Sequence, residues 1–250
     1  MGAYPRMGRA VAAADGTQPA APSRAELAGL TVALTAYNGA LNLAPLPDPL
    51  YVPANLTLTA ALLYGLGHRW GLRPADLGLA RGGLIPGLVV GGAVVGLAGL
   101  GLLAALDVPA AQPLLADARA AGLAGASLAY YTLVRIPLGT AVTEEVIFRG
   151  VLLEGCARRM GLPAAVATSS VAFGLWHIGP TLRLLELNAV DTGPVGTLLA
   201  VAGTVLATTA AGVGFALLRR WGRGLFAPIT AHAGINAASL LAAVAAQRGA

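Results

Sequence analysis

The stretch that decides the fold is LIPGLVVGGAVVGLAGLGLLAAL, which runs from Leu84 to Leu106. No charged side chain interrupts it. At about 1.5 Å of helix per residue, a run of this length crosses a hydrocarbon core of roughly 30 Å. We therefore expect residues 84–106 to span a membrane as an α-helix.

The composition of the whole chain supports the same interpretation. Of its 250 residues, 56% are hydrophobic and 11% are charged, and the mean hydropathy is +0.73. Soluble domains carry about 25% charged residues, because they need a polar surface toward water. The chain is therefore expected to be all-α, a polytopic transmembrane helix bundle. Its net charge of +5 comes from scattered arginines, which favours a lipid bilayer as partner and argues against nucleic acid.

Hydropathy predicts about seven spans. They are residues 27–45, 51–67, 84–106, 121–158, 163–183, 194–218 and 228–246. With the N-terminus inside, eleven arginines fall in inside segments and three in outside segments, as the positive-inside rule requires. Residues 1–25 are expected to form a flexible cytosolic tail. Residues 26–250 would form one membrane-embedded domain, with its motifs at about 121–245, in a multi-pass protein of a bacterial cell membrane.

Small residues recur in the third span. Gly87 and Gly91 form one small-xxx-small pair, and Gly92 and Gly96 form a second. Such pairs let two helices approach closely. We expect them to pack against another helix of the same chain. The single cysteine, Cys156, excludes an internal disulfide and any cysteine-rich metal site.

The fourth run is too long for one crossing, so we expect it to tilt or to leave the membrane near Glu154. Ionisable side chains are few inside the expected spans. They are Arg135, Glu144, Glu145, Arg149, His177 and His232, with the polar Asn236 beside them. A charge inside the bilayer costs about 2.5–3.5 kcal/mol by insertion scales, so such residues predict a function. Arg135 receives no firm role: it is open to a substrate carboxylate, but an interfacial or structural role is favoured.

The two adjacent glutamates are expected to play different parts. Glu145 and Arg149 are four residues apart, so they can pair on one helix face. Glu144 lies about 100° further round the helix, where Arg149 reaches it poorly. One carboxylate is thus neutralised, and Glu144 is left for chemistry. For Glu145 and Arg149, a purely structural ion pair fits equally well.

The two histidines of the spans each have a companion four residues away. Phe173 precedes His177, and Asn236 follows His232. A lone histidine in a span is more often a hydrogen-bonded packing residue than a catalyst. Two such pairs together with the glutamates favour a hydrolytic site, because water attack needs a base, an orienting group and donors for the developing oxyanion.

The motifs resemble those of a known family. Glu-Glu-x-x-x-Arg at 144–149, Phe-x-x-x-His at 173–177 and His-x-x-x-Asn at 232–236 occur in the order found in the CPBP family, which contains CAAX prenyl proteases and bacteriocin-processing enzymes. The resemblance covers about residues 70–245. It implies an intramembrane endopeptidase that acts on a peptide or protein substrate at or in the membrane.

Carried onto this chain, the resemblance implies roles for individual residues. Glu144 and His177 would activate a water for attack on the scissile carbonyl. His232 and Asn236 would donate hydrogen bonds to the oxyanion. Glu145, Arg149 and Phe173 would support these four.

Three alternatives stay open. Glu144, His177 and His232 are also a possible zinc set, although Asn236 suits an oxyanion better than zinc, so a metal-free glutamic mechanism without cofactor is favoured. A non-enzymatic membrane protein, for bacteriocin self-immunity or as a scaffold, would keep its phenotype without Glu144. A transporter would use the polar cluster as an ion site, but no inverted repeat is apparent.

Overall fold

The computed structural model describes residues 21–115 and 117–249, and these form helices joined by short turns, with no strand among them. The long helices are α1 (Arg24–Leu43), α2 (Asp48–Trp70), α3 (Leu84–Leu106), α8 (Leu162–Trp176) with α9 (Ile178–Leu187), α10 (Gly193–Trp221) and α11 (Phe226–Gly249). The short helices are η1 (Arg81–Gly83), η2 (Pro109–Ala111), α4 (Gln112–Leu115) and η3 (Ala118–Ala120). The predicted all-α bundle is confirmed.

Residues 125–160 form one further continuous helical run, the central helix. It consists of α5 (Gly125–Tyr130), η4 (Tyr131–Val142), α6 (Thr143–Glu145), η5 (Val146–Leu152) and α7 (Leu153–Met160). The η4 and η5 segments are π-helical. All residues from Thr143 to Ala157 are buried, so this helix forms the core of the bundle.

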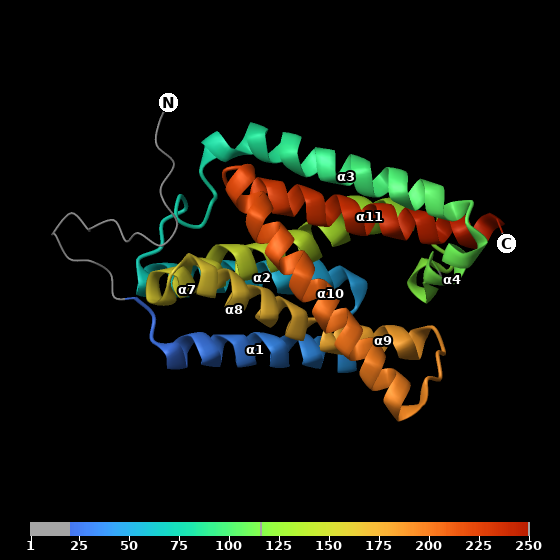
Figure 1. Cartoon of the computed structure of the whole chain (residues 1–250), viewed down its shortest axis with the longest axis horizontal. Coiled ribbons are helices and arrows are strands. Elements are labelled where there is room, and N and C mark those ends of the chain that lie inside the picture. The colour runs from blue at the N-terminus through green and yellow to red at the C-terminus, as the bar shows by residue number, and fades with distance from the viewer. Residues whose placement is uncertain (1–20, 116, 250) are drawn as a thin grey trace.

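The other helices surround the central helix (Figure 1). In Figure 1, α3 and α11 run side by side along the top, α10 crosses the bundle, and α1 lies along the bottom. Six of the seven predicted spans each correspond to one long helical segment of the described residues, and the fifth corresponds to α8 followed by α9. Five of these are long and apolar enough to cross a membrane: 48–70, 81–106, 162–187, 193–221 and 226–248. The number of spans and the inside position of the N-terminus remain predictions.

Two predicted boundaries need correction. The tail was predicted to extend to residue 25, but α1 begins at Arg24, because Ser23 and Glu26 form a reciprocal capping box at its N-terminus. Residues 1–20 of the predicted tail lie outside the described residues. The fifth span was predicted as one helix over 163–183, but α8 ends at Trp176 and α9 begins at Ile178, with His177 between them.

The glycine pairs of α3 differ in what they face. A Cβ atom on Gly87 would lie 2.6 Å from Cβ of Phe226, and one on Gly91 would lie 2.6 Å from the carbonyl oxygen of Ala227. This pair therefore packs against α11, as predicted for a contact within one chain. For Gly92 and Gly96 that prediction was wrong, because a Cβ there would have no described atom within 4 Å.

Candidate active site

The central helix places three of the predicted site residues in the protein core. Glu144, Glu145 and Arg149 are 7%, 0% and 1% exposed. The π-helical winding of η5 begins directly after Glu145. Such segments are frequent at functional sites, because they change the angular register of side chains and carbonyls. Buried charges of this kind require partners, and the structure supplies them.

Glu145 has two basic partners. Its Oε1 atom lies 3.2 Å from Nη1 of Arg149, which confirms the predicted pair. The same oxygen lies 2.8 Å from Nδ1 of His232 on α11, a contact that the sequence did not predict. The carboxylate therefore joins the central helix to the helix that carries the second histidine.

Glu144 faces different neighbours. Its Oε1 atom accepts a hydrogen bond of 3.1 Å from Nε1 of Trp176. Its Oε2 atom is 3.8 Å from Nε2 of His232 and has no hydrogen-bond partner among the described residues. Glu144 is thus oriented through one oxygen, and the other oxygen is buried with its acceptor capacity unused.

His177 occupies the break between α8 and α9. Its Nδ1 atom lies 2.7 Å from the carbonyl oxygen of Phe173. A carbonyl only accepts, so Nδ1 must carry the hydrogen, and Nε2 of the neutral ring keeps its lone pair. This is the form that a base or a water-orienting group needs.

Phe173 lies against three of the other site residues. Its ring centroid is 4.6 Å from that of His177 and 6.0 Å from that of His232. The guanidinium carbon of Arg149 stands 3.9 Å over its face. Phe173 therefore fixes the relative positions of both histidines and the cation by packing.

On α11, His232 is held on both sides. One side is the carboxylate of Glu145, and the other is the ring of Phe215, stacked at 5.1 Å and 13°. Asn236 lies one helical turn later and is half-buried. No described residue hydrogen-bonds to its side chain, so its amide is available to a ligand.

Arg135 takes part in none of these contacts. Its Nε atom lies 3.3 Å from Oδ1 of Asp48, and its guanidinium carbon stands 3.8 Å over the ring of Tyr51. Both partners belong to α2. These contacts support the structural role that the sequence favoured, since they tie the central helix to α2.

The possible zinc ligands do not gather around one point. Among the described residues, no three histidine, cysteine, aspartate or glutamate side chains converge as a metal ion requires. Nδ1 of His177 faces a carbonyl, and Nδ1 of His232 faces Glu145. Because metal-bound histidines are commonly held through their second nitrogen in this way, independence from a metal stays a prediction.

The sequence did not identify several residues that shape the site. Trp176, next to His177 in the motif, could have been singled out by that position, but nothing in the sequence pointed to Phe215. Arg158 and Arg219 belong to the predicted inside segments, and their side chains are buried. Arg158 contacts Asp76 at 3.1 Å and Glu154 at 3.3 Å.

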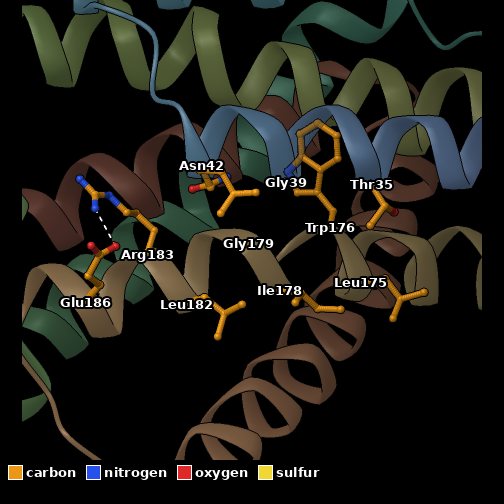
Figure 2. Close-up of a pocket in the computed structure, with 11 residues that line it drawn as sticks. Thr35, Gly39, Asn42, Leu175, Trp176, Ile178, Gly179, Leu182, Arg183 and Glu186 are labelled. Carbon is orange, nitrogen blue, oxygen red and sulfur yellow. Dashed lines mark hydrogen bonds and ion pairs between the residues drawn. The ribbon is translucent and has the colours of Figure 1, made fainter.

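A pocket of about 290 Å³ lies between α1 and α9 (Figure 2). Figure 2 shows Trp176, Gly179 and Leu182 around it, with the Arg183–Glu186 ion pair at one end. The backbone carbonyl of Trp176 accepts a hydrogen bond of 2.6 Å from Asn38, while its indole binds Glu144. Trp176 is therefore shared between the pocket and the site.

Comparison with known proteins gives one family match. Residues 126–238 match the family model described as type II CAAX prenyl endopeptidase, Rce1-like. No curated protein and no solved structure matches the chain. The matched segment includes the buried glutamates, both histidines and Asn236. Residues 126–238 are therefore similar to the Rce1-like family of type II CAAX prenyl endopeptidases, which is consistent with the CPBP resemblance of the motifs.

Proposed function

We propose that the chain is an intramembrane endopeptidase that hydrolyses a peptide bond with a water held by Glu144 and His177. The similarity of residues 126–238 to the Rce1-like family implies a CAAX protease of the membrane. The observation that carries the mechanism is the unused Oε2 atom of Glu144, buried beside Nε2 of His232 at 3.8 Å. A separation of this size suits a bridging water better than a direct hydrogen bond.

Glu144 is the general base of the proposed reaction. The indole of Trp176 holds one of its oxygens, so the other is directed at the water. Nε2 of His177, which keeps its lone pair, orients the same water. As the water oxygen bonds to the scissile carbonyl carbon, its proton passes to Glu144.

His232 and Asn236 stabilise the oxyanion. Nδ1 of His232 donates to Glu145, so the ring offers an N–H at Nε2 only as an imidazolium. Ionised Glu144 and Glu145 balance that imidazolium and Arg149, so the buried cluster carries no net charge. Asn236, one turn away, contributes its amide N–H. Glu144 then returns its proton to the departing amine, and the C–N bond breaks.

The substrate is a peptide or protein that meets the membrane. The pocket between α1 and α9 adjoins the site through Trp176 and is lined mainly by apolar side chains. We assign it to an apolar part of the substrate. An occupant would contact the residue that orients Glu144, so substrate binding and base orientation would be coupled.

The proposed reaction needs no metal. The donor set of the site does not converge on one point, whereas each donor has a place in acid–base hydrolysis. This supports the glutamic mechanism over the zinc mechanism.

The test uses purified protein in liposomes with prenylated and unprenylated CAAX peptides, analysed by mass spectrometry. Cleavage is expected for the wild type and none for Glu144→Ala or His177→Ala, provided these variants unfold at the wild-type temperature. A parallel comparison of new C-termini in membranes bearing wild type or Glu144→Ala identifies natural substrates. Identical C-termini in both membranes, with no peptide cleaved, would exclude the protease and favour a non-enzymatic role.

A further inference from the structure

The buried guanidinium of Arg219 lies where three segments of the chain meet. It is 4% exposed, near the end of α10. Nη1 donates to the backbone carbonyl of Arg149 in η5, and Nη2 donates at 2.6 Å to the carbonyl of Asp76 in the loop after α2. The carboxylate of Glu154 lies 3.9 Å from Nη2. One side chain therefore connects α10, the central helix and this loop.

The carbonyl of Arg149 belongs to a helical segment with an altered hydrogen-bond pattern. The preceding carbonyl, that of Phe148, accepts a hydrogen bond of 2.6 Å from the hydroxyl of Ser169 on α8. Two consecutive carbonyls of the π-helical segment are thus bound by side chains of neighbouring helices. Insertion of side chains into the backbone ladder is a recognised cause of local rewinding. Ser169 and Arg219 hold the winding that begins at Glu145.

The same contacts fix the beginning of α11. Gly78 adopts a φ of +78°, and a Cβ there would lie 3.2 Å from Nε of Arg219. The carbonyl of Gly78 accepts a hydrogen bond of 2.8 Å from the backbone N–H of Leu225, the residue before α11. In Figure 1, α10 turns into α11 beside the start of α3. His232 follows two turns into α11, where it meets Glu145.

We propose that Arg219 is a positioning residue, which sets the contact between His232 and Glu145 by locking the start of α11 to the π-helical segment after Glu145. The inference rests on the proposed function only for its effect on turnover. Arg219 itself does not touch the reacting atoms. The side chain must donate from two nitrogen atoms at once, because the two carbonyls belong to different segments. A guanidinium has this planar pair of donors, and the single ammonium group of lysine does not.

The experiment compares Arg219→Gln and Arg219→Lys with Arg220→Gln, an exposed arginine at the next position. Because the chain has three histidines, ¹⁵N-histidine labelling in detergent gives few signals, assigned with His68→Asn and His177→Asn. Both Arg219 variants are expected to change the His232 ring signals, and Arg220→Gln to leave them unchanged. In cleavage assays, kcat falls about tenfold to a hundredfold while KM stays within about twofold.

The outcomes separate this inference from the protease proposal. A folded Arg219→Gln or Arg219→Lys protein with unchanged His232 signals and kcat would overturn the positioning role and leave the protease intact. Changed His232 signals in a protein whose wild type cleaves no peptide would support the positioning role and overturn the protease. If Arg219→Gln does not fold, Arg219→Lys decides between these results. This variant keeps the positive charge but lacks the paired donors of the guanidinium.

Discussion

The Nδ1 atom of His232 lies 2.8 Å from Oε1 of Glu145, a residue 87 positions earlier in the chain. The contact links the glutamate motif of the central helix to the histidine motif of α11. Glu145 therefore has a part in the site beyond its pairing with Arg149, because its carboxylate accepts the hydrogen of Nδ1 and leaves Nε2 of His232 to face Glu144.

Replacement of Glu145 by glutamine should destabilise the fold strongly. Arg149 would lose its charged partner inside the core, a change that costs about 3–5 kcal/mol. Unfolding by SDS titration should show this loss, and Glu145→Gln/Arg149→Met should recover part of it. The control is Glu186→Gln, which breaks an exposed ion pair and should cost at most about 1 kcal/mol. Equal losses for Glu145→Gln and Glu186→Gln would contradict the buried pair.

Replacement of Trp176 by phenylalanine should lower kcat about tenfold to a hundredfold. The variant removes the N–H that holds Glu144, and hydrogen bonds to charged groups contribute about 1.5–3 kcal/mol. Trp221→Phe is the matched control, because that tryptophan is 61% exposed and should be replaceable without effect. Steady-state cleavage measures both variants. A full kcat in Trp176→Phe would mean that Glu144 is oriented by other groups.

Asn236→Ala should reduce kcat about a hundredfold to a thousandfold, the usual loss when one oxyanion donor is removed. Its side chain has no described hydrogen-bond partner, so thermal stability should change little. Asn188→Ala on the loop after α9 is the control, since Asn188 binds backbone groups outside the site. If Asn236→Ala raises KM alone, the amide binds substrate rather than the transition state.

Activity should survive thorough treatment with a chelator. Purified, dialysed protein should contain zinc far below one atom per chain by elemental analysis, because the site donors do not converge. Stoichiometric zinc, with activity lost on its removal and restored on its return, would overturn the metal-free mechanism.

The orientation can be tested with cysteine labelling. Cys156 is the only cysteine and is buried, so Cys156→Ala provides a clean background. Cysteine placed at Arg223 should be protected from a membrane-impermeant maleimide in intact cells, and cysteine at Asp191 should react. The reverse pattern would invert the predicted topology.

How far the sequence determined the structure differs from element to element. The charge-free run of α3 and the pair formed by Glu145 and Arg149 were predictable, because each depends on local composition or on helical spacing. The break at His177 and the contact between His232 and Glu145 were not, because they depend on the packing of distant helices. The partners of Arg219 could not be predicted for the same reason, because its two carbonyl acceptors belong to residues 70 and 143 positions away in the chain.

The π-helical winding after Glu145 has a consequence for how this protein can diverge. Each residue inserted or deleted between Val146 and Leu152 would rotate the preceding glutamates relative to everything that follows, because each helical residue adds a turn about the axis. Glu145 would then face away from His232, and Glu144 away from Trp176. Substitutions in this segment are expected to be tolerated, but insertions and deletions are not. Active homologues should therefore differ here in side chains and keep the same segment length.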